Sequence, residues 1–244
     1  MNQVTEVTAR GRAVFTLAGV RDGAVQSLIL APSVFAFGLA FGILAAGAGL
    51  SLLEAMLMSG WVNAGGAQMA VLQNWAEPIP LLTLCLTVLA MNARYVLLSA
   101  ALYPWIRHLP SRQTYPSLFI LGDGNWALAL RNFTERKPDA GFLLGSGLVM
   151  WATWQCSTIV GHLFGQVLGD PKRFGIDFMV AAFFASMAVG FFRAARGATP
   201  LIVAIVVAIL VERLVTGPWY IFAGALAGSL AGAWQYGGQN VDPA

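Results

Sequence analysis

Residues 79–102 read IPLLTLCLTVLAMNARYVLLSAAL, an almost unbroken apolar run with one charged residue, Arg94. About 24 helical residues, at roughly 1.5 Å each, extend roughly 36 Å, which is enough to cross the hydrocarbon core of a bilayer. An arginine at mid-span costs roughly 2.5–3.5 kcal/mol on insertion scales. The run therefore predicts a transmembrane helix. Arg94 is either a functional residue or a side chain whose charge reaches the nearer membrane surface.

The composition of the chain indicates a membrane protein. Of its 244 residues, 58% are hydrophobic and 10% are charged, and the mean hydropathy is +0.71. Soluble domains do not have these values. We expect an all-α, polytopic integral membrane bundle with no room for a separate soluble catalytic domain. The Lys and Arg residues are scattered rather than clustered, which argues against a nucleic-acid surface.

Apolar length predicts where the transmembrane helices lie. The expected spans are near residues 28–46, 51–74, 79–103, 140–168, 175–193, 198–216 and 218–236. A further segment, 117–133, is short and contains Gly122-Asp123-Gly124-Asn125, so we expect a broken or re-entrant helix there. The prediction is a single transmembrane domain, 28–236, of seven or eight spans. It lies between a cytoplasmic N-terminal segment, 1–27, and a C-terminal tail, 237–244.

Two features bear on orientation in the inner (plasma) membrane. Residues 1–27 lack the uninterrupted apolar stretch of a cleavable signal peptide, so we expect the first span to be retained. If 117–133 crosses the membrane, a mild excess of Lys and Arg favours a cytoplasmic N-terminus. If it does not cross, the same comparison decides nothing.

A short motif occurs twice in the apolar spans. Gly38-Leu39-Ala40-Phe41-Gly42 resembles Gly161-His162-Leu163-Phe164-Gly165, and another apolar helix follows each. The recurrence suggests internal three-helix repeats, 28–103 and 140–216, as in transporters that bind substrate between two repeats. The alternative is that Gly-x-x-x-Gly recurs because close helix packing needs small residues, as a third ladder from Gly224 to Gly232 indicates.

The span at 51–74 carries Asn63-Ala64-Gly65-Gly66-Ala67-Gln68 near its centre. Paired glycines weaken a helix by roughly 1 kcal/mol each relative to alanine, and an opened backbone cannot face lipid. We expect a discontinuous helix whose second half, from about Ala67, directs its N–H groups at an anion such as an amino-acid carboxylate. The alternative is a tight glycine contact between helices beside two hydrogen-bonded amides.

Arg94 needs a polar partner if it lies within the membrane. On a regular helix it shares a face with Thr83 and Thr87, whereas Asn92 points almost the opposite way. Asp123 is the acid in the best sequence context to pair with Arg94, and such a pair is a plausible switch for proton coupling. Alternatively, Asp123 caps a short helix at a membrane surface.

The other polar residues in apolar segments give weaker signals. Gln155 and His162 share one face of 140–168 and either line the same cavity or form hydrogen bonds between helices. Cys85 and Cys156 lie in apolar segments and suggest neither a disulfide nor a metal site. We expect no cofactor, no metal and no catalytic residues, which disfavours a membrane-embedded enzyme.

Four stretches occur in a characteristic order. They are Ser59-Gly60-Trp61-Val62-Asn63-Ala64-Gly65-Gly66-Ala67-Gln68, Met91-Asn92-Ala93-Arg94-Tyr95-Val96-Leu97-Leu98-Ser99, Asp123 and Gly175-Ile176-Asp177-Phe178. Together they resemble the AzlC family, the large subunits of branched-chain amino acid exporters, over roughly residues 20–195. The resemblance implies export of leucine, isoleucine and valine, with methionine as a further candidate, driven by the proton-motive force. It also implies a small AzlD-type membrane subunit as partner.

This chain departs from the family pattern at two positions. The family usually has histidine where this chain has Tyr95, and an acidic pair where this chain has Asp123-Gly124. The second departure argues against a coupling role that needs two carboxylates.

The residues and the resemblance predict a secondary exporter, in which Arg94 or the half-helix from residue 67 onward binds the substrate carboxylate. The expected substrate-binding residues are Asn63, Gly65, Gly66, Gln68, Asn92 and Arg94, and Asp123 is expected to assist coupling. One alternative is a carrier or channel for another small organic anion, which would use Arg94 without a preference for branched side chains. Another is a membrane scaffold subunit that does not transport.

Overall fold

In a computed structural model, the described part of the chain is built from α-helices. The structure describes residues 12–76, 78–168, 198–215 and 219–237, with single positions at 175, 178, 181, 182 and 185. The helices are α2 (Leu17–Ser27), α3 (Ala31–Gly47), α4 (Leu52–Val62), α5 (Gly65–Gln73), α6 (Leu81–Asn92), α7 (Arg94–Ile106), α8 (Ser111–Phe119), α9 (Asp123–Glu135), α10 (Ala140–Leu168), α12 (Ala198–Leu214) and α13 (Trp219–Gly237).

The chain divides into two compact units. The first contains residues 1–68 and 92–176, and the second contains residues 69–91 and 177–244. Every candidate site residue named above belongs to the first unit.

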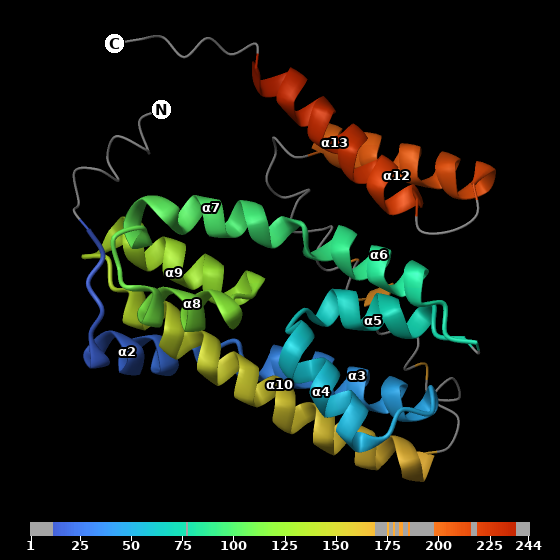
Figure 1. The fold of residues 1–244 in the computed structure, drawn as a ribbon, viewed down its shortest axis with the longest axis horizontal. Coiled ribbons are helices and arrows are strands. Elements are labelled where there is room, and N and C mark those ends of the chain that lie inside the picture. Colours follow the sequence, from blue (N-terminus) through green and yellow to red (C-terminus); the bar gives the residue numbers. More distant parts are fainter. Residues whose placement is uncertain are drawn as a thin grey trace. The chain divides into compact units, whose positions relative to one another are not determined.

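Helix α10 is the longest element of the first unit, with 29 residues. Helices α2 and α3 lie against it along most of its length (Figure 1). Thr16 caps the start of α2, and its hydroxyl accepts a hydrogen bond from Gly19 N at 2.9 Å. Asp139 precedes α10 and accepts hydrogen bonds from Gly141 N at 2.8 Å and Thr16 N at 3.1 Å. The starts of α2 and α10 are therefore tied together by their caps.

Glycines allow the helices to approach α10 closely. A Cβ added at Gly161 would overlap the carbonyl oxygen of Leu39, and one at Gly145 would overlap that of Val20. Added Cβ atoms at Gly23 and Gly42 would in turn overlap carbonyl oxygens of α10. The two motifs that suggested a repeat thus pack against each other, which explains their recurrence by packing. The duplication itself stays a prediction.

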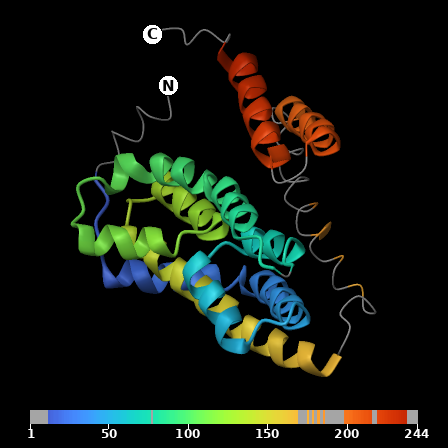
Figure 2. The ribbon, with the colours of Figure 1, turned by 45° about the vertical axis from the view of Figure 1, so that its right-hand side comes forward.

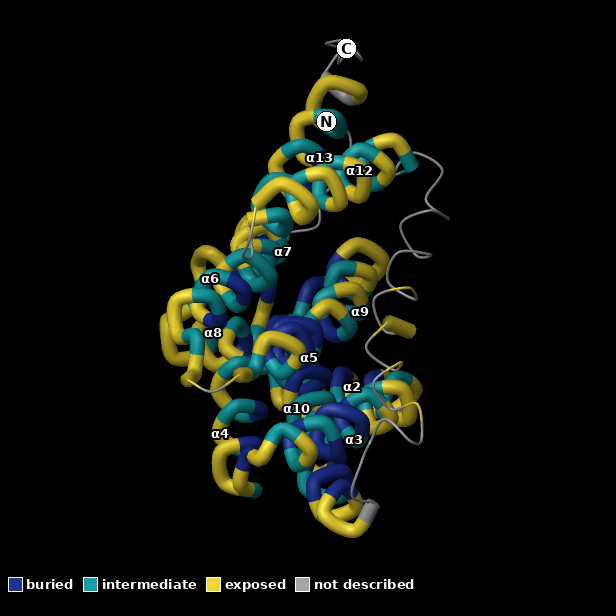
Figure 3. Tube along the Cα trace, turned by 90° about the vertical axis from the view of Figure 1, so that its right-hand side faces the viewer, coloured by how far each residue is buried: buried dark blue, intermediate teal, exposed yellow. Residues whose placement is uncertain are grey.

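A hydrophobic core joins α7, α9 and α10. Leu102, Phe133, Phe142 and Leu143 are buried in it, and the rings of Trp105 and Phe133 pack edge to face with centroids 5.7 Å apart. Figure 3 shows buried residues concentrated along α10 and α3. This core holds α7 and α9 in place, and these helices carry Arg94 and Asp123.

Several predicted helices are confirmed. Helix α10 has the predicted bounds, 140–168, while α3, α12 and α13 fall within a few residues of the predicted spans 28–46, 198–216 and 218–236. Most of the predicted span 175–193 lies outside the described residues. Helix α2 was not predicted.

Two predicted spans are interrupted and a third is continuous. The 51–74 span is divided into α4 and α5, as expected from its glycines. The 79–103 span is confirmed as one long helix, Leu81–Ile106, in which the backbone stays helical at Ala93, the residue between α6 and α7. The 117–133 segment falls on α8 and α9, which meet at Gly122 and confirm the expected break; whether it crosses the membrane stays a prediction.

Length and apolar composition identify few complete spans in the described ranges. Leu81–Ile106, formed by α6 and α7, is the one stretch there that is long and apolar enough to cross a membrane. Leu17–Ser27 and Ala31–Gly47 would add a second if this pair, bent by 70°, is counted as one span. The number of crossings therefore remains a prediction.

In the second unit, α12 and α13 pack side by side (Figure 2). A Cβ at Gly224 or Gly228 would lie 2.9 Å from the carbonyl oxygen of Ala204 or Pro200. The third glycine ladder of the sequence is thus another close helix contact.

Candidate functional site

The break between α4 and α5 is centred on Asn63. This residue adopts the left-handed conformation, with φ 44° and ψ 36°, which asparagine tolerates better than most residues. Helix α5 then begins at Gly65, two residues earlier than the predicted start at Ala67. Gly65 and Gly66 therefore form the first turn of α5, where backbone N–H groups have no acceptor within the helix.

Gly65 packs directly against Trp154 of α10. A Cβ at Gly65 would lie 2.5 Å from Cη2 of the indole, so the contact requires glycine. The indole stacks on Phe41 of α3, with ring centroids 6.1 Å apart and an interplanar angle of 27°. Its Nε1 is buried and has no hydrogen-bond partner among the described residues. Trp154 was not among the predicted site residues.

A buried chain of polar side chains connects α5, α4 and α10. Gln68 Nε2 donates to Ser59 Oγ at 3.3 Å, and the hydroxyls of Ser59 and Thr158 are 3.0 Å apart. All three residues have 0% exposure. Gln68 Oε1 is buried and lacks a hydrogen-bond partner within the described ranges. The same holds for Oε1 of Gln155 on α10.

Asn63 connects this break to the one between α8 and α9. Its Nδ2 donates to the carbonyl oxygen of Phe119 at 3.3 Å, which satisfies a backbone acceptor at the end of α8. The ring of Trp61 meets that of Phe119 edge to face, with centroids 6.1 Å apart. The two breaks are therefore neighbours within the first unit.

Asn125 organises the break between α8 and α9. Its side chain is 1% exposed, accepts from Gly122 N at 2.6 Å and donates to Ile120 O at 3.2 Å. This fixes the chain just before the first residue of α9, Asp123.

Arg94 and Asp123 form an ion pair. Arg94 Nη2 lies 3.1 Å from Asp123 Oδ2, and the two side chains are 28% and 48% exposed. The expected pairing is thus confirmed. The roles of both residues in binding and coupling stay predictions. The Arg94 guanidinium also lies over the Tyr95 ring, 5.3 Å from its centroid.

Asn92 is not brought into this ion pair. It is the last residue of α6, and its buried Oδ1 has no partner in the part of the chain that the structure describes. No hydrogen bond among those residues joins it to Arg94, Asp123 or Gln68. Its predicted role in shaping the site is therefore not reflected in a contact.

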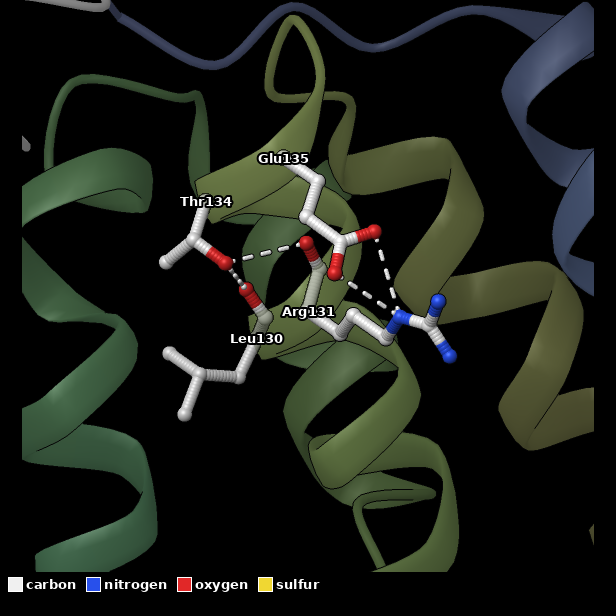
Figure 4. A network of polar contacts seen from close by, with 4 residues as sticks. All are labelled: Leu130, Arg131, Thr134 and Glu135. Carbon is white, nitrogen blue, oxygen red and sulfur yellow. Dashed lines mark hydrogen bonds and ion pairs between the residues drawn. The ribbon is translucent and has the colours of Figure 1, made fainter.

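The other end of α9 is polar and exposed. Arg131 Nε donates to both carboxylate oxygens of Glu135, at 3.0 and 3.1 Å, and Thr134 Oγ1 donates to the backbone oxygens of Leu130 and Arg131 (Figure 4). Exposed pairs of this kind contribute little to stability. This exposed pair is a control for the Arg94–Asp123 pair, because it lies on α9, the helix that also carries Asp123.

An open apolar groove of about 400 Å³ adjoins the two breaks. Its lining residues are Met56, Leu57, Gly60, Trp61, Phe119, Trp151 and Gln155. One polar amide and six apolar residues suit an aliphatic group attached to a polar one.

Among the described residues, no group of three or more His, Cys, Asp or Glu side chains is placed to hold a metal ion.

Comparison with known proteins points to one family. Residues 30–168, which contain all the site residues described above, match the family model described as AzlC protein. The inner membrane protein YgaZ of Escherichia coli (strain K12) is 28% identical over 236 residues, covering 94% of each chain. An uncharacterized membrane protein of Archaeoglobus fulgidus is 28% identical over 148 residues, or 61% of this chain and 64% of that protein. No solved structure matches.

Proposed function

Because the chain belongs to the AzlC protein family, we propose that it is a secondary transporter that exports branched-chain amino acids. Both relatives are named membrane proteins, which supports a membrane location. We further propose that it works as the large subunit of a permease with a small AzlD-type membrane partner, in the inner membrane and with a cytoplasmic N-terminus.

The observation that carries the proposal is the interrupted helix of α4 and α5. Its second half starts with Gly65 and Gly66, whose N–H groups have no intrahelical acceptor, beside buried amides. Interrupted membrane helices of this kind bind substrate carboxylates in other transporters. Arg94 is already neutralised by Asp123 at 3.1 Å, so we assign the carboxylate to the start of α5.

The adjoining open groove suits the rest of the substrate. Its volume, about 400 Å³, exceeds that of a leucine, isoleucine or valine side chain, and its walls are mainly apolar. We propose that the branched side chain occupies it, because burying apolar surface provides roughly 25 cal/mol per Å².

The ion pair is our candidate for the coupling element. Protonation of Asp123 would neutralise the carboxylate and break its ion pair with Arg94. Because Asp123 is 48% exposed, a proton can reach it. This arrangement would use one carboxylate, in agreement with the glycine at position 124.

The test is efflux of radiolabelled leucine, isoleucine and valine from preloaded cells that express this chain with or without the small partner subunit. We expect saturable efflux that needs both chains and is lost on addition of a protonophore. Arg94→Ala should abolish this efflux while the protein remains assembled in membranes, and Arg131→Ala is the control. Full export by Arg94→Ala would refute the proposed role of the ion pair.

A second candidate is a carrier for another small organic anion. The exposed part of Arg94 and the start of α5 favour it, because both would attract any carboxylate. Competition separates the candidates: short organic acids without an aliphatic side chain should not inhibit leucine efflux from an amino acid exporter. If no substrate moves in an assembled complex, a scaffold role is supported instead.

A further inference from the structure

Three buried polar atoms beside the α4–α5 break lack partners among the described residues. They are Gln68 Oε1, Gln155 Oε1 and Trp154 Nε1. Buried polar atoms are nearly always hydrogen-bonded, because each unsatisfied one loses its interactions with water. Gln68 makes the strongest case, since the whole residue has 0% exposure.

The three atoms belong to one neighbourhood. Gln68 bonds to Ser59, and a methyl group at Gly60 would lie 3.2 Å from Gln155 Nε2. Ser59 and Gly60 are in the last turn of α4. The indole of Trp154 abuts Gly65, the first residue of α5. Side chains from α5 and α10 therefore surround the ends of both half-helices.

The Gln68 amide is anchored by the Ser59 hydroxyl. Its Nε2 donates to Ser59 Oγ, and the Ser59 hydroxyl is in turn 3.0 Å from that of Thr158. The chain engages one end of the amide, and the other end, Oε1 in this structure, has no partner among the described residues. A preorganised acceptor loses little conformational entropy when it binds a ligand.

The unsatisfied atoms are two acceptors and one donor, and none is charged. The N–H groups at the start of α5 add further donors. A simple carboxylate uses donors alone, whereas a zwitterion also needs acceptors for its ammonium group. We propose that the α4–α5 break is a zwitterion site. The carbonyl oxygens of Gln68 and Gln155 accept from the substrate ammonium, and Trp154 Nε1 and the start of α5 donate to its carboxylate.

This inference rests on the proposed function, because it takes the transported substrate to be an amino acid. It adds the discrimination of that substrate from organic acids and amines, and it adds Trp154 and Gln155 as specificity-determining residues. A recognition site without net charge also leaves the Arg94–Asp123 pair intact in the substrate complex.

The experiment uses leucine counterflow in proteoliposomes that contain the full chain with its small partner subunit. Competitors are 4-methylpentanoate, which lacks the ammonium group of leucine, and 3-methylbutylamine, which lacks the carboxylate. We expect each to inhibit at least roughly tenfold more weakly than leucine, because each leaves buried partners unpaired. If 4-methylpentanoate competes as well as leucine, the zwitterion site is overturned while the transporter proposal stands.

Variants assign the two halves of the site. Gln68→Met and Gln155→Met keep the volume of the side chain and remove its carbonyl oxygen. Each should raise the KM for leucine by roughly 10- to 100-fold, because hydrogen bonds to charged groups are strong, and leave inhibition by 4-methylpentanoate unchanged. Trp154→Phe should weaken the binding of leucine and of 4-methylpentanoate, which both carry the carboxylate. It should leave inhibition by 3-methylbutylamine unchanged.

The control is Ser146→Ala on the same helix, α10, since the buried Ser146 hydroxyl donates only to backbone oxygens of its own helix. If the two amides have only a structural role, Gln68→Met and Gln155→Met should weaken the binding of leucine and of 4-methylpentanoate equally. That result would overturn the assignment. The wild-type competition series decides the question even if a variant fails to assemble. No leucine counterflow by an assembled wild-type complex would overturn the proposed function and this site with it.

Discussion

Arg94 and Asp123 are each the first residue of a helix, and their side chains join the two helix starts at 3.1 Å. The positive end of a helix dipole lies at its N-terminus, so Asp123 is favourable at the start of α9. The ion pair also neutralises the charge of Arg94, which lies within the long helix Leu81–Ile106. The stability of α7 near its start therefore depends on a residue of α9.

This dependence predicts the behaviour of single and double variants. Arg94→Ala or Asp123→Ala should each lower the free energy of unfolding by about 1–3 kcal/mol, because each leaves a half-buried charge unpaired. The double alanine variant should be less destabilised than the sum of the two. Thermal unfolding in detergent measures this, and strict additivity would show that the pair is not coupled.

Exchange of the charges separates stability from transport. Arg94→Asp combined with Asp123→Arg keeps the ion pair and one charge of each sign at the two helix starts. We expect the free energy of unfolding to return to within about 1 kcal/mol of wild type, since the ion pair itself is kept. Leucine efflux should remain absent, because the carboxylate that we propose for coupling has moved from α9 to α7. Leucine efflux at the wild-type rate by this double variant would show that coupling does not need a carboxylate at position 123.

Gly65→Ala should damage the site through Trp154. The added methyl group would lie 2.5 Å from the indole, which also stacks on Phe41. We expect a loss of about 1–3 kcal/mol in unfolding free energy and reduced leucine export. Trp154→Phe in the same chain should restore part of the stability. Gly122→Ala is the control, because its methyl group would lie 3.6 Å from Asn125 Oδ1, an ordinary contact.

The link between helix caps predicts a stability difference between two nearby acids. Asp139→Ala removes acceptors for Gly141 N, Thr16 N and the Thr16 hydroxyl, so we expect a loss of about 2 kcal/mol or more. Glu135→Ala removes only an exposed pair with Arg131 and should cost about 0.5 kcal/mol or less. Equal melting temperatures for the two variants would contradict the linked-cap interpretation.

Membrane placement predicts the reactivity of cysteines. Cys85 is exposed on the apolar helix α6, so we expect it to face lipid and to resist a charged maleimide in opened membranes. Thr134→Cys, at the polar end of α9 and in a chain that also carries Cys85→Ser and Cys156→Ser, should be labelled readily. After SDS is added, Cys85 and the cysteine introduced by Thr134→Cys should be labelled at similar rates. Fast labelling of Cys85 without SDS would place this face of α6 in water.

Apolar length located most helices because long apolar segments have few alternatives in a membrane. It did not locate α2, since Arg21 and Asp22 make residues 17–27 appear polar. The signal that could have found it is a stripe of small residues at intervals of four, Gly19, Gly23 and Ser27, all of which are buried.

The candidate site was predictable where the chemistry is local. Paired glycines indicated a break in 51–74, and the position of Asp123 in the broken Gly-Asp-Gly-Asn segment indicated it as the partner of Arg94. Helix propensity did not specify which residue would take the left-handed conformation, so the start of α5 was placed at Ala67 instead of Gly65. The contact of Trp154 with Gly65 is purely tertiary and left no local pattern.

The glycine contacts of α10 also constrain how the length of this helix can vary. Gly145 packs against α2 and Gly161 packs against α3. A helix turns about 100° per residue, so one residue inserted between these glycines would rotate one contact face by about 100° relative to the other. One neighbour would then meet side chains in place of glycine. Natural insertions and deletions in related chains should therefore fall in the connections between helices and spare residues 146–160.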